Sequence, residues 1–88
     1  MNPSEERNIQ AAIESILFVA GEPVSEKKLA GILDIEVALL KEELAKLALR
    51  YKESAESGLH LLFHKDQVSL TTKPEQAPLI ELLTKETL

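Results

Sequence analysis

The chain has 88 residues, enough for one small domain that buries only about 60–65% of its unfolded surface. It contains no cysteine, so disulfides and thiolate metal sites cannot stabilise it, and its stability must come from packing. The net charge of −5 lowers the expectation that duplex DNA is the main partner, although a local basic patch is not excluded. Aromatic residues are only 3% of the sequence, so we expect an aliphatic core.

No targeting or membrane segment is evident in the sequence. The first eight residues are polar, and no apolar run approaches the roughly 20 residues that a membrane span requires. No internal repeat or low-complexity stretch is present either. The sequence therefore predicts a soluble, cytoplasmic protein.

A first helix is predicted from Ser4, as its N-cap, to about Ala20. Its apolar residues recur every three or four positions and so share one face: Ile9, Ile13, Ile16, Leu17 and Ala20. Gly21 follows, where a left-handed cap costs least, and Pro23 prevents the helix from resuming. A helix that stops sharply and restarts at once predicts the entry to a helix-turn-helix.

Phe18 does not share the apolar face of this helix. At about 100° per residue it lies roughly 180° around from Ile9 and Ile16. The simpler interpretation, which we favour, is a central helix packed on two sides. The alternative is that Phe18 lies in a contact between subunits.

Two further helices are expected. The second runs from Ser25 to Leu33, with Leu29, Ile32 and Leu33 facing inward. Asp34 is predicted to be the N-cap of the third, which extends to Lys52 or Glu53. Six residues of the third helix form its core stripe: Val37, Leu40, Leu44, Leu47, Ala48 and Tyr51. Leu39 and Leu49 fall outside this stripe and are expected to be exposed, as are the neighbours Glu42 and Glu43.

After a polar loop from Glu53 to Gly58, the period of the apolar pattern changes from 3.6 to 2. Inward-facing Leu59, Leu61 and Phe63 alternate with outward-facing residues, and a second strand follows a turn at residues 65–67. Three helices followed by a two-stranded hairpin wing predict a winged helix-turn-helix, a mostly helical α+β fold. Pro74 ends the second strand, and from Pro78 the spacing of leucines predicts one more helix.

No catalytic constellation is found, so we do not expect an enzyme or a cofactor. His60 and His64 are the best metal candidates, but on a strand they are about 13 Å apart at ~3.3 Å per residue, too far to share an ion. None of the glycines lies in a phosphate-binding pattern, and no serine lies in a nucleophile elbow.

The stretch from Ile13 to Ser25, IESILFVAGEPVS, resembles the opening helix and turn of segregation and condensation protein B, the ScpB family. The resemblance extends more weakly over nearly the whole chain, and it departs in the wing turn, where Lys65-Asp66-Gln67 replaces the glycines common in that family. It implies that residues 1–74 form the N-terminal winged helix, and that residues 75–88 form a connector towards a second winged helix absent from this chain.

The resemblance also implies a function. Members of this family are non-enzymatic, nucleoid-associated subunits of the bacterial SMC–kleisin condensin complex, acting in chromosome condensation and segregation. It implies a homodimer that binds the kleisin, segregation and condensation protein A, and through it the SMC ATPase.

The residues leave a second reading open, a DNA-binding winged-helix transcriptional regulator. In such proteins the third helix enters the major groove. Between Glu36 and Glu53 this helix has four acids and four bases, and Arg50, its one arginine, lies at the wrong end for guanine recognition. We therefore expect protein contacts rather than sequence-specific DNA binding. The candidate dimer or partner contacts are the apolar residues off their core stripes: Phe18, Leu39, Leu49 and Leu62.

Overall fold

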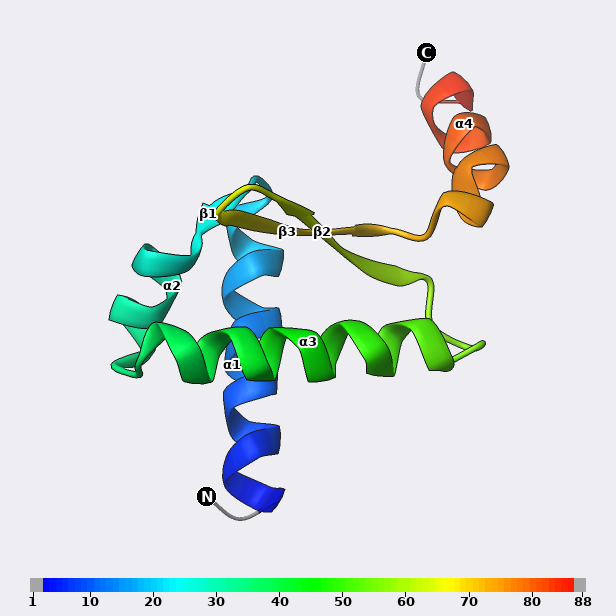
Figure 1. Cartoon of the computed structure of the whole chain (residues 1–88). Coiled ribbons are helices and arrows are strands. Elements are labelled where there is room, and N and C mark those ends of the chain that lie inside the picture. Colours follow the sequence, from blue (N-terminus) through cyan, green and yellow to red (C-terminus); the bar gives the residue numbers. More distant parts are fainter. Residues whose placement is uncertain (1–2, 87–88) are drawn as a thin grey trace.

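The computed structural model describes residues 3–86, with the side chains of residues 8–85. Three helices come first: α1 (Pro3–Ala20), α2 (Glu26–Leu33) and α3 (Val37–Glu53). The strands β2 (Leu59–His64) and β3 (Gln67–Thr72) then form the wing, and a 3₁₀ turn η1 (Pro74–Gln76) leads into α4 (Ala77–Glu86). Figure 1 shows α1 crossing α3, with the wing above α3 and at the level of the C-terminal end of α1. The predicted winged-helix fold is confirmed.

A short strand, β1 (Val24–Ser25), was not predicted. It pairs antiparallel with β3, with Val24 opposite Val68, and so makes a three-stranded sheet of order β1-β3-β2. The Glu26 amide donates to the Asp66 carbonyl at 2.8 Å, which continues the connection to the wing turn. Two residues are too few for a period-2 pattern to be detected, but they attach the wing to the turn between α1 and α2.

The core lies where α1, α2, α3 and the inner face of the sheet meet. Its fully buried side chains are almost all aliphatic, as expected: Ile13, Leu17, Leu29, Leu40, Leu44, Leu47 and Val68. Removing each such side chain from water contributes about 1.5–3 kcal/mol to the stability of the fold. The predicted stripe of α3 is confirmed, with Tyr51 at its C-terminal end also buried.

The turn that opens the helix-turn-helix has the predicted chemistry. Gly21 has a φ of 64°, the left-handed conformation expected of a helix C-cap, and its amide donates to the Leu17 carbonyl. Ser25 caps α2, because its hydroxyl accepts a hydrogen bond from the Lys28 amide at 3.1 Å. The sharp stop and restart are therefore confirmed.

Three of the predicted caps and turns were wrong. Asp34 does not cap α3: it has a φ of 55° and ends α2 in the left-handed conformation that aspartate tolerates, while Glu36 occupies the N-cap position of α3. Ser4 cannot be an N-cap, since α1 already begins at Pro3. The wing turn has two residues, Lys65 and Asp66, rather than three, because Gln67 already belongs to β3.

Three residues assigned to the core are exposed. Ala20 is the last residue of α1, Ile32 is near the end of α2, and Phe63 lies close to the wing tip. Each has the periodicity of a core residue, but Ala20 and Ile32 lie near the ends of their helices, and Phe63 lies on the edge strand of the sheet, opposite buried Val68. Periodicity gives the face of an element, and it does not say how far the packing reaches along it.

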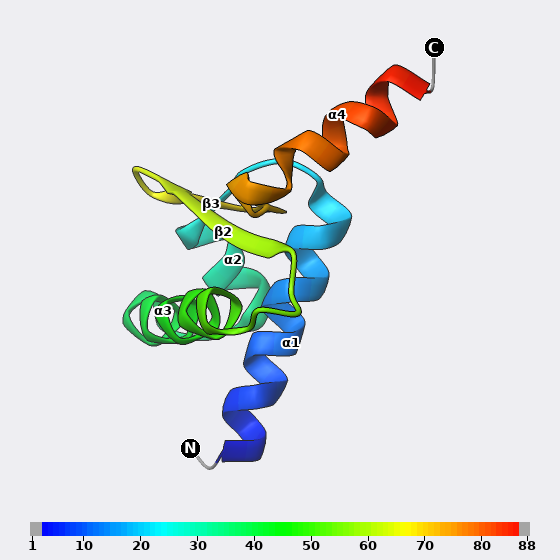
Figure 2. The same cartoon turned by 90° about the vertical axis from the view of Figure 1, so that its right-hand side faces the viewer.

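The helix α4 projects away from the winged helix (Figures 1 and 2). It begins at Ala77, one residue before the predicted start, and its main contact is with η1. Four of its large apolar side chains are exposed: Leu79, Ile80, Leu82 and Leu83. The prediction that Thr87 and Leu88 stop this helix concerns residues outside the described part of the chain.

Candidate interaction surfaces

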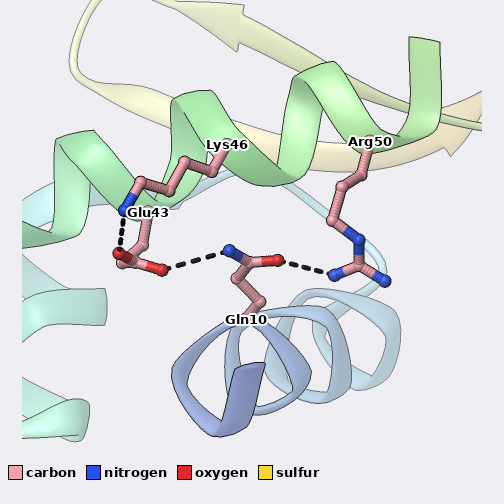
Figure 3. Close-up of polar contacts among 4 residues, drawn as sticks. All are labelled: Gln10, Glu43, Lys46 and Arg50. Atoms are coloured by element: carbon pink, nitrogen blue, oxygen red, sulfur yellow. Dashed lines mark hydrogen bonds and ion pairs between the residues drawn. The ribbon is translucent and has the colours of Figure 1, made fainter. Parts of the chain in front are cut away.

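A buried polar network fixes α1 on α3 (Figure 3). The Gln10 amide nitrogen donates to Glu43 Oε1 at 3.1 Å, and Arg50 Nη1 donates to Gln10 Oε1 at 2.6 Å. Lys46 Nζ lies 3.4 Å from the other Glu43 oxygen. Because each end of the Gln10 amide has a partner on α3, the network sets both the register and the rotation of α1 against that helix.

This network corrects the expectation that Glu43 is a solvent-facing acid. Only 1% of Glu43 is exposed, whereas Glu42 beside it is in solvent. Burial of a carboxylate is tolerated only when the group is paired and hydrogen-bonded, as it is here through Gln10 and Lys46. The position of Glu43 in the sequence indicated burial, since it lies one turn from the core residues Leu40 and Leu47. The charge of its side chain favoured exposure instead.

A second polar contact joins α1 to the end of α3. The Tyr51 hydroxyl donates to Glu14 Oε2 at 2.5 Å. Burial raises the pKa of Tyr51 well above its ordinary value, and the hydrogen bond and negative charge of Glu14 raise it further, while Arg50 lowers it slightly. Tyr51 therefore stays protonated in the folded protein, and this contact leaves Glu14 at the edge of an apolar surface.

The apolar surface beside Glu14 is the last turn of α1. Phe18 is 77% exposed and Val19 is 84% exposed, so the favoured interpretation of a helix packed on two sides was wrong. Hollows lie on both sides of Val19: one reaches Leu59 and Leu70 on the wing, and the other reaches Ile32 on α2. An exposed phenylalanine that borders apolar hollows is typical of a contact surface rather than of isolated exposed side chains.

A second apolar surface lies between α3 and the wing. Leu49 and Phe63 are about half exposed and line one hollow of about 490 Å³ together with buried Leu61. Lys52, His60 and Lys73 also line it, and Glu75 is the one acid. This hollow is therefore apolar at its centre and mainly basic at its rim.

The four predicted contact residues do not form one surface. Phe18 and Leu49 line separate hollows, and Leu62, 51% exposed on the outer face of β2, lines neither of them. Leu39 is half-buried and not exposed as expected, and it lines a hollow beside the turn between α2 and α3. Of the four, Phe18, Leu49 and Leu62 have the predicted exposure.

Metal ligands are not gathered among residues 8–85, whose side chains the structure describes. Within that range no three His, Asp or Glu side chains are grouped so that they could hold a metal ion, and His60 and His64 are both exposed on β2. None of the described helices has the length and apolarity to cross a membrane. The features that remain to be explained are the exposed apolar surfaces.

Comparison with known proteins places this arrangement in a family. The family model for the segregation and condensation complex subunit ScpB matches residues 11–88. Segregation and condensation protein B of Carboxydothermus hydrogenoformans is 40% identical over 81 residues, and that of Desulforamulus reducens is 39% identical over 77. The alignments cover 89% and 88% of this chain but 42% of each relative, so the chain spans about two fifths of their length.

Solved structures agree in fold. A crystal structure of a dimer of the ScpB N-terminal domain complexed with ScpA peptide is 27% identical, with a TM-score of 0.81, and the match covers 88% of this chain and 95% of that one. The structure of ScpB from Mycobacterium tuberculosis has a TM-score of 0.85 at 22% identity, over 93% of this chain and 51% of that one, and it supports the fold alone. With a family model that covers residues 11–88, the chain belongs to the ScpB family of segregation and condensation complex subunits.

Proposed function

We propose that this chain is the dimerising, kleisin-binding part of a non-enzymatic subunit of a bacterial SMC–kleisin complex, which acts at the nucleoid in chromosome condensation and segregation. The observation that carries the proposal is the 27%-identical neighbour, a dimer of the ScpB N-terminal domain complexed with ScpA peptide, 95% of which is matched by this chain. The family match over residues 11–88 supports the same assignment.

The exposed apolar surfaces give the proposal a physical basis. A winged helix that acts alone has no need for a phenylalanine and a valine that are both more than three-quarters exposed on one helical turn. We assign Phe18, with Leu49 and Leu62, to dimer or partner contacts. Residues 1–74 would then be the winged helix, and residues 75–88 a connector towards a second winged helix. The greater length of the curated relatives supports this division.

The DNA-binding alternative has little support from α3. Arg50, the arginine of that helix, donates to Gln10 and so has a structural partner on α1. The exposed acids Glu42 and Glu53 lie among the remaining lysines. A recognition helix with this balance of charge gains little from neutralising phosphates.

Sedimentation velocity tests the proposal. The chain is run alone at several concentrations, with purified ScpA from the same organism, and with a labelled DNA duplex at moderate salt. We expect a dimer that co-sediments with ScpA and leaves the duplex behind. A monomer that ignores ScpA would contradict the proposal. A species that carries the duplex, and does so less as salt rises, would identify a DNA-binding protein instead.

A further inference from the structure

The strand β2 has a free edge. It is the outer strand in the order β1-β3-β2, and its six residues make it much longer than β1 at the opposite edge. Natural proteins usually protect such an edge with proline, a bulge or charged side chains, since an open edge pairs with other strands. The sequence of β2, LHLLFH, contains no proline, lysine, arginine or acidic residue, and its register with β3 has no bulge. An unprotected edge of this length suggests that another strand covers it.

The register shows which backbone groups point outward. The Lys73 amide donates to the Gly58 carbonyl at 2.7 Å, so residues 58 and 73 form a hydrogen-bonded pair. Bonded and non-bonded pairs alternate along an antiparallel ladder, and Leu59, Leu61 and Phe63 are therefore the residues that direct N–H and C=O away from β3. The Leu59 amide agrees with this assignment, because it donates to Ser57 Oγ and not to a carbonyl of β3.

The outward-facing amides of Leu61 and Phe63 have no partner among the described residues like the one that Leu59 has in Ser57. No residue in the described part of the chain bonds to the outward backbone groups of Leu61, which is 3% exposed, or of Phe63, which is 47% exposed. These groups are two residues apart, which is the spacing at which an added antiparallel strand forms its hydrogen bonds. Recognition of an extended peptide by a sheet edge uses this arrangement of main-chain donors and acceptors.

The hollow between α3 and the wing opens at the same edge. His60 lines it from the outer face of β2 and Phe63 from the inner face, so the hollow straddles the edge of the strand. Leu49 provides apolar surface on the α3 side, and Lys52 lies beside it. Lys73 is held in place, because its ammonium group donates to the Ser54 carbonyl at 2.7 Å. Successive side chains of an added strand point to opposite faces, so one would meet the apolar hollow and the next the basic rim.

The geometry points to one occupant: we propose that the free edge of β2 takes an extended, acidic segment of the kleisin as an added antiparallel strand. An apolar side chain of that segment enters the hollow beside Leu49 and Phe63, and a neighbouring carboxylate faces Lys52. A second copy of this chain fits less well, because a two-fold contact between β2 edges would bring the basic rim of one copy against that of the other. The inference rests on the proposed function and specifies where the kleisin binds.

Amide hydrogen exchange measured by NMR tests the pairing residue by residue. The chain is compared with and without full-length ScpA from the same organism. We expect exchange at Phe63, the more exposed of the two residues, to slow by at least about tenfold on binding, while Leu62, whose amide already faces β3, changes little. Protection of Phe63 in the chain alone, rising with its concentration, would mean that a second copy occupies the edge, and would overturn the proposed occupant.

Substitution at Phe63 separates the backbone donor from the side chain. Phe63→Pro and Phe63→Ala both remove the ring, but proline also removes the outward N–H, a change that an edge strand tolerates. The proline variant should bind ScpA about tenfold more weakly than the alanine variant. Lys52→Glu should weaken binding at least about twofold, and Lys41→Glu, an exposed lysine elsewhere on α3, should not.

The outcomes distinguish this inference from the proposed function. If the chain binds ScpA but Phe63 shows no new protection and the two Phe63 variants bind equally, the edge is not the site, and only the inference fails. If the unmodified chain does not bind ScpA at all, the proposed function fails and the inference with it. Circular dichroism of each variant confirms that the comparison is made between folded proteins.

Discussion

The middle and the last turn of α1 have the same apolar character in the sequence and opposite exposure in the structure. Ile13 and Leu17 are fully buried, and Gln10 and Glu14 bond to α3. Directly after Leu17, Phe18 and Val19 are exposed next to two hollows. The first part of the helix defines how the domain packs, and the second is available to a partner. Apolar residues in a small domain are thus not all core residues, and separate substitutions can test the two roles.

The largest effect is expected in the middle of α1. Ile13→Ala removes buried side-chain volume and should lower the free energy of unfolding by about 2–5 kcal/mol. Phe18→Ala, only five residues away, should change it by no more than about 0.5 kcal/mol. Urea denaturation followed by circular dichroism measures both. Similar losses for the two variants at concentrations where the chain is monomeric would mean that Phe18 belongs to the core.

A smaller effect is expected in the buried network. Glu43→Ala leaves the Gln10 amide nitrogen buried without its acceptor and should destabilise the domain by about 1–3 kcal/mol. Glu42→Ala is the matched control, because the same group is removed from an exposed position on the same helix, and it should stay within about 0.5 kcal/mol. Equal costs from the two urea titrations would show that the network does not stabilise the contact between α1 and α3.

The smallest effect at neutral pH is expected at Tyr51, but it depends on pH. Tyr51→Phe removes the hydrogen bond to Glu14 and should cost about 1 kcal/mol at about pH 8. The folded-state pKa of Tyr51 is raised above the ordinary value of 10.0. Above about pH 10 the unfolded chain releases this proton while the folded chain retains it, so the stability of the unmodified protein falls as pH rises.

The Tyr51→Phe variant has no phenolic proton to release, so its stability should decrease less than that of the unmodified protein between about pH 8 and about pH 11. Urea titrations of both proteins at these two pH values provide the comparison. If the two proteins lose the same stability over this range, Tyr51 is not the group responsible for the alkaline dependence.

Much of the fold could be predicted from local patterns. The stop at Gly21, the cap at Ser25 and the stripe of α3 each depend on a few neighbouring residues, and all three were found. The predictions failed where the outcome depended on distant parts of the chain. Asp34 could cap either of two helices, and the burial of Glu43 required knowledge of Gln10, 33 residues away.

The candidate surface was predictable only in part. Helical angles correctly put Phe18 outside the core face, but they could not show whether a second layer covered it. The same argument failed for Leu39, which is half-buried beside the turn between α2 and α3. The open edge of β2 gives no signal in the residue pattern, because the absence of a neighbouring strand is a property of the whole topology.

We propose that the last turn of α1 serves the contact between the two copies of a dimer and not the fold. Sedimentation velocity of Phe18→Asp beside the unmodified chain, over a range of concentrations and with circular dichroism melts of both, tests it most directly. We expect a folded monomer for the variant and a dimer for the unmodified chain. A Phe18→Asp protein that is folded and still fully dimeric would contradict the claim, as would one that unfolds outright.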